Sequence, residues 1–300
     1  MRKETLVYKA VPGCEIRADV YRPDERSVLP AIIWIHGGAL ITGSRSGISP
    51  SERDRYLDAG FAVICIDYRL APETHLASIV EDVRDALAWV QAEGPSLFQI
   101  DPSRIAAVGH SAGGYLALLS GCWVAPRLRA IVAYYGYGDI VGDWYSRPDP
   151  FYRRQPIVTE EAARASIGNC PLSAASGPDA QRRSSFYLYC RQQGRWPREV
   201  AGSDPDTEPE VFDRFCPVRQ VTAAYPATLL LHGDRDTDVP YEQSTRMAAA
   251  LARAGVEHEL ITIAGGGHGF DRDLDQTEVA AALERADGFL RRHLTDKQET

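Results

Sequence analysis

The sequence has no run of about eighteen consecutive apolar residues, and without one a membrane-spanning helix is excluded. Polar residues, Met-Arg-Lys-Glu-Thr, open the chain, and the apolar core of a signal peptide does not follow them. The sequence has no excess of basic residues. It contains 33 Lys and Arg and 41 Asp and Glu, which gives a net charge of −8. No basic stripe with interleaved aromatic residues is present, so we expect neither a nucleic-acid partner nor a membrane span.

The six cysteines never occur in the Cys-x-x-Cys spacing that is typical of metal and redox sites. Cys65 and Cys122 fall within apolar patterns, where buried free thiols are common. We therefore expect a reducing, cytoplasmic setting. A disulfide among the cysteines of residues 137–221 stays open.

Residues 109–113, Gly-His-Ser-Ala-Gly, form the most informative motif that is present. They follow the apolar run 105–108 and precede the helix-like segment 114–120. A strand, a Gly-x-Ser-x-Gly turn and a helix in this order are typical of a nucleophile elbow. Such a turn holds the serine at the edge of a sheet and at a helix N-terminus, where developing negative charge is stabilised. Ser111 is therefore the candidate nucleophile; the alternative is a glycine-rich turn with a capping serine.

A second glycine motif lies upstream of the serine. The apolar segment 31–35 runs directly into His-Gly-Gly-Ala at residues 36–39. Glycines at such a place let backbone N–H groups approach an oxyanion closely. The alternative is an ordinary turn after a strand, which the co-occurrence with the serine motif disfavours.

The candidate base lies near the C-terminus of the chain. Residues 257–263 are strand-like, and Gly-Gly-Gly-His-Gly-Phe follows at 265–270. His268 thus lies in a flexible loop after the last expected strand, where it could take the proton of Ser111. We expect the remaining histidines to be structural, with His36 supporting the loop at 36–39, His110 pointing into neighbouring structure and His232 packed at a strand end.

Three aspartates, Asp234, Asp236 and Asp238, compete for the role of the acid that orients this histidine. They share one loop after the apolar segment 228–231. Asp238 could cap the helix expected after it, and Asp234 could form a local ion pair. The residue pattern by itself leaves this choice open.

Together these motifs resemble the α/β-hydrolase superfamily in its carboxylesterase and lipase-like branch. Residues 65–73, Cys-Ile-Asp-Tyr-Arg-Leu-Ala-Pro-Glu, with the motifs at 36–38 and 113–114, are similar to hormone-sensitive-lipase-type esterases. Residues 232–240, His-Gly-Asp-Arg-Asp-Thr-Asp-Val-Pro, are instead similar to prolyl-oligopeptidase-type and acylaminoacyl-peptidase-type hydrolases. In that pattern the acid is the aspartate before x-x-Val-Pro, which is Asp236 here.

The resemblance implies roles for individual residues. It implies a triad of Ser111, Asp236 and His268, in the chain order expected for the superfamily. By similarity to esterases with His-Gly-Gly-Gly, the oxyanion would be bound by the backbone N–H groups of Gly38, Ala39 and Ala112. Ala39 stands where those esterases usually have a third glycine, and this change keeps the backbone donor.

Strands and helices alternate along most of the chain, which predicts an α/β-hydrolase fold with a mostly parallel sheet and helices on both faces. The first two strands are expected to form an antiparallel edge. Strands are expected near residues 4–9, 15–21, 31–36, 61–67, 104–109, 129–135, 227–232 and 257–263. Helices are expected near residues 50–59, 75–93, 111–122, 241–254 and 276–294.

Residues 137–221 break this alternation and predict a cap insertion between strands six and seven, because about 85 residues exceed a simple connection. The core is then 1–136 and 222–300. Short helices are expected at 160–165 and 184–191. We expect aromatic cap residues to line the acyl or alcohol pocket, namely Trp144, Phe186, Tyr187 and Trp196. The alternative is a surface segment with its own small core, or an oligomer contact.

The expected activity is that of a serine hydrolase that cleaves a small carboxylic ester through an acyl-enzyme intermediate. No metal or organic cofactor is required for this chemistry. An amide or peptide hydrolase is the alternative that residues 232–240 suggest, although 300 residues leave no room for the large extra domain of the oligopeptidases. A non-catalytic ligand receptor on the same fold is disfavoured, because such proteins usually lose a triad member.

Overall fold

The computed structural model describes residues 1–23, 27–125 and 127–295. Its strands are β1 (Arg2–Val11), β2 (Cys14–Arg22), β3 (Leu29–Ile35), β4 (Ala62–Ile66), β5 (Ile100–His110), β6 (Ala130–Tyr134), β7 (Ala227–Gly233) and β8 (His258–Ile263). Within the described ranges these eight strands form one sheet of order β1-β2-β4-β3-β5-β6-β7-β8. β2 pairs antiparallel with β1 and β4, and the other neighbours pair in parallel. The predicted mostly parallel sheet with an antiparallel edge is confirmed.

The inner strands are buried on both faces, which explains their unbroken apolar sequences. Every residue of β3 and of β4 is buried. β1, at the edge of the sheet, instead alternates between exposed and half-buried residues over much of its length.

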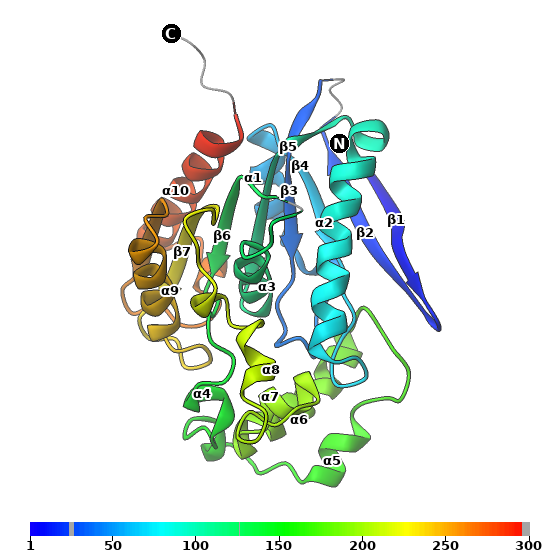
Figure 1. The fold of residues 1–300 in the computed structure, drawn as a ribbon, viewed down its shortest axis with the longest axis vertical. Helices are drawn as coiled ribbons and strands as arrows, with labels where there is room; N and C mark the ends of the chain where they lie inside the picture. Colours follow the sequence, from blue (N-terminus) through cyan, green and yellow to red (C-terminus); the bar gives the residue numbers. More distant parts are fainter. Residues whose placement is uncertain (24–26, 126, 296–300) are drawn as a thin grey trace.

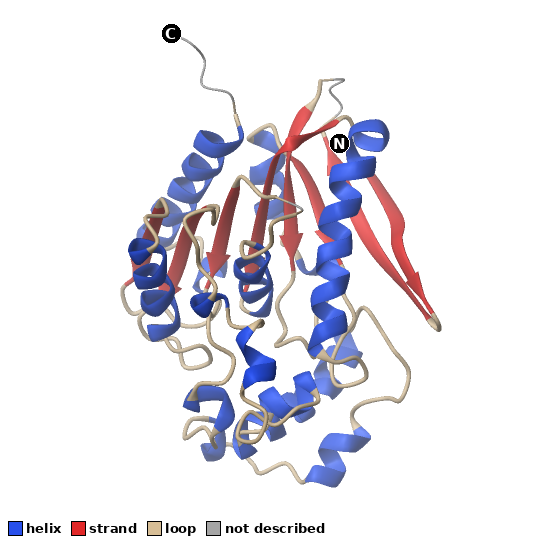
Figure 2. Ribbon diagram, viewed as in Figure 1, coloured by secondary structure: helices blue, strands red, loops and turns tan. Residues whose placement is uncertain are grey.

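Helices cover both faces of this sheet (Figures 1 and 2). α2 (Leu76–Phe98), α3 (Ala112–Ser120) and α9 (Glu242–Arg253) contribute to one apolar cluster. α1 (Pro50–Asp58) and α10 (Thr277–Leu294) contribute to a second cluster on the opposite face. The predicted three-layer α/β arrangement is therefore confirmed.

Helix α2 continues to Phe98, beyond its predicted end at residue 93. Pro95 lies within this last part of α2 and removes only one backbone donor near the end of the helix. Phe98 is buried and packs edge-on against Trp89, with 5.8 Å between ring centroids. Burial of this ring favours the longer helix.

Residues 137–221, which we call the cap, lie beyond the carboxyl ends of the parallel strands, at the lower end of the molecule in Figure 1. The helix predicted at 160–165 is α5, whereas the one predicted at 184–191 begins earlier, with α6 starting at Gly177. The cap contains α4 (Asp143–Ser146), α5 (Glu160–Ala165), α6 (Gly177–Gln193), α7 (Trp196–Ala201) and α8 (Glu210–Asp213).

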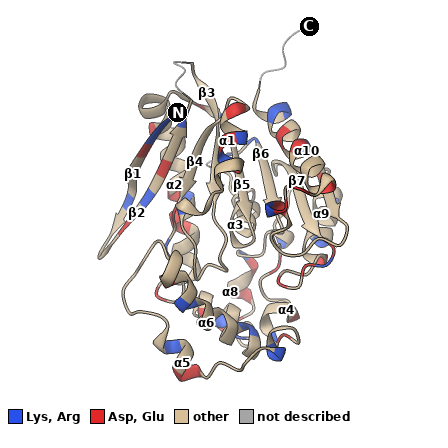
Figure 3. Cartoon of the chain, turned by 180° about the vertical axis from the view of Figure 1, so that it is seen from behind, with Lys and Arg blue, Asp and Glu red and all other residues tan. Residues whose placement is uncertain are grey.

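Acidic and basic residues are interspersed over the side of the molecule that Figure 3 draws, rather than gathered by sign. In the described part of the chain, every helix is too short or too polar to cross a bilayer. All six cysteines lie in the described ranges and are free thiols, so the disulfide left open for the cap is not formed.

A buried ion pair fastens α6 to the core. Arg183 donates to both carboxylate oxygens of Glu73, at 2.6 and 2.7 Å, and its side chain is only 2% exposed. The same guanidinium donates to the carbonyls of Ile41 and Ala71. Burial by itself raises the pKa of Glu73, but hydrogen bonds from Arg183 and from the Gly168 N–H hold that pKa below its usual value.

Arg183→Met should lower the free energy of unfolding by about 3–5 kcal/mol, because Glu73 would stay buried without its cationic partner. Urea unfolding followed by circular dichroism measures this loss. Arg182→Met is the matched control, since Arg182 is 58% exposed and pairs at 3.5 Å with an exposed carboxylate. Its expected loss is under about 1 kcal/mol. Equal losses in the two variants would contradict the role of the buried pair.

Candidate active site

Ser111 lies in a sharp turn between β5 and α3, as the Gly-x-Ser-x-Gly motif predicts. Its φ of 54° and ψ of −118° are rare for a residue with a side chain. The flanking glycines permit this turn. A Cβ on Gly109 would lie 2.2 Å from the Gly113 carbonyl oxygen, and a Cβ on Gly113 would lie 2.0 Å from the Ile35 carbonyl oxygen. The turn therefore presses directly against the end of β3.

The loop after β3 passes beside Ser111. A Cβ on Gly37 would lie 3.3 Å from the Ser111 Cβ. Ala39 has a φ of 55°, so the alanine keeps a left-handed backbone that glycine adopts more easily. Among the described residues, no acceptor is paired with the N–H of Gly38 or Ala39. The N–H of Ala112 begins α3 and has no intrahelical acceptor, so these groups could bind an oxyanion.

Support for this loop comes from His36 and its neighbours. The His36 Nδ1 lies 2.8 Å from the Gly37 carbonyl oxygen, and the ring stacks on Tyr68 at 4.2 Å. The Tyr68 hydroxyl donates to the His36 carbonyl at 2.8 Å. Burial lowers the pKa of His36 to about 4, so the ring is neutral at neutral pH. His36 thus has the supporting position that the sequence predicts.

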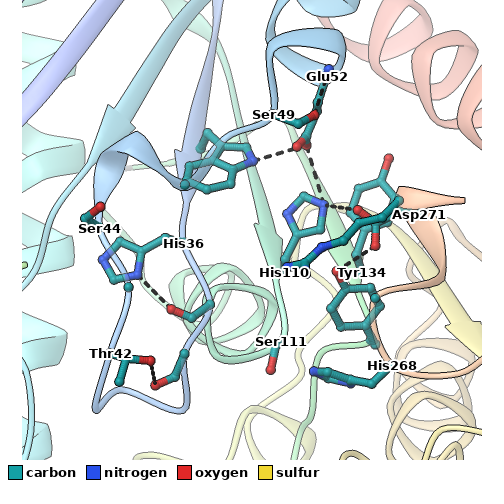
Figure 4. A pocket seen from close by; sticks show the side chains of 18 of the residues that line it. His36, Thr42, Ser44, Ser49, Glu52, His110, Ser111, Tyr134, His268 and Asp271 are labelled. Atoms are coloured by element: carbon teal, nitrogen blue, oxygen red, sulfur yellow. Dashed lines mark hydrogen bonds and ion pairs between the residues drawn. The ribbon is translucent and has the colours of Figure 1, made fainter. Parts of the chain in front are cut away.

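Asp236 and His268 are joined by a short hydrogen bond. The Nδ1 of His268 lies 2.7 Å from the Asp236 Oδ2. The other carboxylate oxygen, Oδ1, accepts from the N–H groups of Asp238 and Val239 at 2.8 and 2.9 Å. Figure 4 shows the imidazole of His268 directed toward the hydroxyl of Ser111. The three residues that the resemblance implied are brought together.

Both partners of this bond have shifted pKa values. Burial by itself raises the pKa of Asp236, but hydrogen bonds from His232 and His268 and from backbone N–H groups hold it well below its usual range. Burial by itself lowers the pKa of His268, but the bond to Asp236 and the charges of Asp238, Asp236 and Asp271 outweigh burial and raise it above 6.5. His268 therefore needs a higher pH than free histidine to become a neutral base.

The two other loop aspartates behave differently from Asp236. Asp234 Oδ1 accepts from the Gly265 N–H at 2.7 Å, on the histidine-bearing loop. Asp238 does not cap α9, because the residue before that helix is Tyr241 and no side chain caps it. Instead Asp238 lines the cavity that contains Ser111 and His268.

This cavity has a volume of about 690 Å³ and contains the loop at 37–39, Ser111 and His268 in its wall. It continues past Ser111 to His110, whose Nε2 lies 3.5 Å from carboxylates of both Glu52 and Asp271 (Figure 4). The His110 ring stacks on Tyr134 as expected for a structural histidine, yet it also lines the cavity. Sequence reasoning missed this polar group, because Glu52, His110 and Asp271 are far apart in the chain.

Of the aromatic cap residues expected to contact substrate, Tyr187 lines the cavity and three do not. Trp196 is fully buried and donates its Nε1–H to the Ala39 carbonyl at 3.0 Å. Phe186 is fully buried in the apolar cluster that α6 joins. Trp144 stacks on Tyr145 at 3.6 Å. That expectation is wrong for these three residues, because their rings form the core of the cap instead.

Smaller residues take their place in the cavity wall. Ala180, Ser184 and Tyr187 line it, at a spacing that puts them on one face of α6. In the sequence, two small residues and a tyrosine follow one another at helical spacing, at positions 180, 184 and 187. This spacing is the signal that could have indicated the cavity-facing side of α6. Within the described ranges, no group of three or more His, Cys, Asp or Glu side chains is arranged to hold a metal ion.

Two protein-family models match the chain. The model described as BD-FAE matches residues 18–146, and the model described as prolyl oligopeptidase family matches residues 186–297. The first range contains the loop at 36–39 and Ser111, and the second contains Asp236 and His268. The resemblance to carboxylesterase-like α/β-hydrolases is confirmed, as is the prolyl-oligopeptidase-type character of residues 232–240, whereas the upstream match is to BD-FAE rather than to a hormone-sensitive-lipase-type model.

The chain is 32% identical, over 98% of its length, to a segment of the non-reducing polyketide synthase ausA of Aspergillus calidoustus. It spans 14% of the length of that synthase. The likeness therefore concerns one small part of a much longer protein.

Two solved structures are similar over nearly the whole chain. The thermophilic esterase Est2 from the Planctomycetes species Thermogutta terrifontis has a TM-score of 0.67 and 24% identity, covering 99% of this chain and 95% of that one. An alpha/beta hydrolase superfamily protein from Enterococcus faecalis has a TM-score of 0.71 and 17% identity, covering 97% of this chain and 99% of that one. At these identities the likeness concerns the fold, and it confirms the α/β-hydrolase fold expected from the sequence.

Gly113→Ala should destabilise the protein by about 1–3 kcal/mol or more, because its methyl group would overlap the Ile35 carbonyl. Gly288→Ala is the matched control, since Gly288 is also helical and has no atom within 4 Å of a built Cβ. That control should stabilise the protein by about 0.5–1 kcal/mol. Chemical unfolding measures both changes, and a neutral Gly113→Ala would contradict the close approach of β3 and α3.

Proposed function

We propose that this chain, which belongs to the α/β-hydrolase superfamily, is a serine hydrolase that cleaves carboxylic esters through an acyl-enzyme intermediate. One observation carries the proposal: His268 is held by the buried Asp236 at 2.7 Å, with its ring directed toward Ser111 in the strained turn. The likeness to the esterase Est2 supports an ester as the substrate.

In the first step, the Oγ of Ser111 attacks the ester carbonyl carbon while its proton passes to the Nε2 of His268. The Nδ1–H stays hydrogen-bonded to Asp236, which stabilises the imidazolium that forms. The new Oγ–C bond turns the carbonyl oxygen into an oxyanion, and the N–H groups of Gly38, Ala39 and Ala112 bind it.

In the second step, the tetrahedral intermediate collapses and the carbon–oxygen bond to the alcohol breaks. The departing alkoxide takes the proton from the Nε2 of His268, and Ser111 is left acylated. A water molecule then gives its proton to the same nitrogen and attacks the acyl carbon. Collapse of this second intermediate releases the acid and restores the Ser111 hydroxyl, so no cofactor takes part.

Amide or peptide cleavage is a second candidate, because the prolyl oligopeptidase family model matches the half of the chain with Asp236 and His268. Matched ester and amide pairs of the same acyl group test this candidate. The ester should be cleaved faster under either candidate, since an alcohol is a better leaving group than an amine. We expect no measurable cleavage of the amide, and amide cleavage well above the uncatalysed rate would favour the second candidate.

Ser111→Ala should lower ester turnover by roughly 10³–10⁶, because the nucleophile is lost while the fold is kept. Asp236→Asn should also lower kcat strongly, because an amide would neither hold His268 in the required tautomer nor stabilise its imidazolium form. The measurement is hydrolysis of a panel of acyl, aryl, lactone and amide substrates. Asp234→Asn is the matched control from the same loop and should cost much less.

If Ser111→Ala kept a tenth of the parent's ester turnover, Ser111 would not be the nucleophile. Labelling by a fluorophosphonate tests the activation of Ser111 without a natural substrate, because only an activated serine reacts quickly. Absence of both labelling and hydrolysis in the parent protein would favour a non-catalytic ligand receptor.

We further propose that one face of α6 sets the size of the substrate. Ala180, Ser184 and Tyr187 face the same cavity as Ser111. Small side chains at the first two positions leave room beside the nucleophile. The other aromatic residues of the cap that were expected in the pocket, Trp144, Phe186 and Trp196, act on substrate choice only through the position of this helix.

Ser184→Phe should lower kcat/KM for bulky esters by roughly tenfold or more relative to acetyl esters, because the ring would fill part of the cavity. A series of esters of increasing acyl and alcohol size measures this change. Gln181→Phe is the matched control, because Gln181 is an exposed residue of α6 outside the cavity wall. An unchanged ranking of esters in Ser184→Phe would contradict the role of α6.

A further inference from the structure

Asp238 contacts both the candidate base and the cap. Its Oδ2 lies 3.4 Å from the Nε2 of His268. Its Oδ1 accepts hydrogen bonds from the hydroxyls of Tyr152 and Tyr187, at 2.7 and 2.5 Å, and from Arg191 at 2.7 Å. The two oxygens of one carboxylate therefore face the active site on one side and the cap on the other.

The cap donors hold this carboxylate firmly. Arg191 is buried, with a side chain 1% exposed, and it also pairs with Asp149 at 2.5 Å. Its guanidinium lies over the Tyr152 ring, 4.5 Å from the centroid. Tyr187 and Arg191 are four residues apart on α6, and Tyr152 belongs to the short helix η2 (Tyr152–Arg154). The position and charge of Asp238 therefore depend on two elements of the cap.

The chemistry of His268 makes the location of this carboxylate significant. Because Nδ1 is engaged by Asp236, Nε2 is the nitrogen that exchanges a proton with Ser111. A carboxylate beside Nε2 favours the imidazolium, which carries a proton there, over the neutral base, which carries a lone pair. Each hydrogen bond that the cap donates to Asp238 withdraws negative charge and weakens this effect.

We propose that Asp238 is a positioning residue that sets the proton affinity of His268 and makes it depend on the cap. The inference rests on the proposed function in that His268 is taken as the general base. The raised pKa of His268 agrees with it, since the charge of Asp238 is among the causes that outweigh burial.

Other groups also face His268 and belong to the same electrostatic setting. Asp236 binds Nδ1, and the Tyr135 ring lies 4.5 Å from the imidazole. Asp271, from the short helix η4 (Phe270–Arg272), accepts from the Tyr135 hydroxyl at 2.7 Å. Among the described residues, none of these three groups has a hydrogen bond to a cap residue, whereas Asp238 has several. Asp238 is therefore the connection between the cap and the base.

The test uses two variants with opposite expected effects on the full chain. Asp238→Asn removes the charge yet keeps a carbonyl oxygen for Arg191 and the tyrosines, so the acid limb of kcat/KM should move to lower pH. Tyr152→Phe removes one donor to Asp238 and keeps the ring over Arg191, so that limb should move to higher pH. Asp234→Asn, with the same loss of charge in the same loop, should leave the midpoint in place.

The readout is the rate of ester hydrolysis between pH 4 and 9, with labelling by a fluorophosphonate as a second rate. One unit below its midpoint the parent keeps roughly a tenth of its plateau rate, and Asp238→Asn should keep a larger fraction. A merely structural role would lower the plateau without moving the midpoint. Midpoints of Asp238→Asn and Tyr152→Phe that match the parent would overturn the inference.

A titration that needs no substrate keeps this inference separate from the proposed function. In Ser111→Ala, the His268 ring is followed by NMR with labelled histidine, and a His268→Gln variant assigns its signal. We expect the same opposite shifts on adding Asp238→Asn or Tyr152→Phe. If neither substitution moves the midpoint of the His268 titration, the inference is wrong even if the parent protein cleaves esters. If the midpoints move but the parent protein has no turnover, the inference is supported and the proposed function fails.

Discussion

The close approach of α3 to the end of β3 is the contact on which the rest of the site depends. Only a residue without a side chain fits where Gly113 faces the Ile35 carbonyl. At this contact Ser111 has a positive φ of 54°, and the loop at 37–39 lies beside it. The candidate nucleophile and the candidate oxyanion donors are thus positioned by close packing of backbone against backbone.

The two carboxylates beside His268 differ in burial and in their hydrogen-bond partners. Asp236 is fully buried and saturated by donors, so it stays ionised and orients the ring. Asp238 is partly exposed and shares its charge with Arg191 and two tyrosines. Two carboxylates in one short loop therefore act differently because their surroundings differ. The first is tied to the core through His232 and backbone N–H groups, and the second is tied to the cap.

Local patterns predicted the features that depend on the backbone. The turn at 109–113 and the glycine loop at 36–39 are such features, since glycine spacing and strand-helix order determine them. The cavity wall was not predictable in the same way. Which face of α6 turns toward Ser111 depends on how Arg183 and Glu73 pack, and those residues are 110 positions apart. The role of Asp238 was equally hidden, because its tyrosine partners lie 51 and 86 positions away.

The cap cannot be replaced without affecting the candidate active site. Trp196 donates to the Ala39 carbonyl and Arg183 donates to the Ile41 carbonyl, so the loop that would bind the oxyanion is held by the segment that would select the substrate. A chimaeric protein with a different cap has to supply hydrogen-bond donors to the same two carbonyls. Without them, the loop loses the contacts that hold its conformation. Replacing the cavity-facing residues Ala180, Ser184 and Tyr187 leaves both donors in place, so the shape of the cavity can change while the loop keeps its hydrogen bonds.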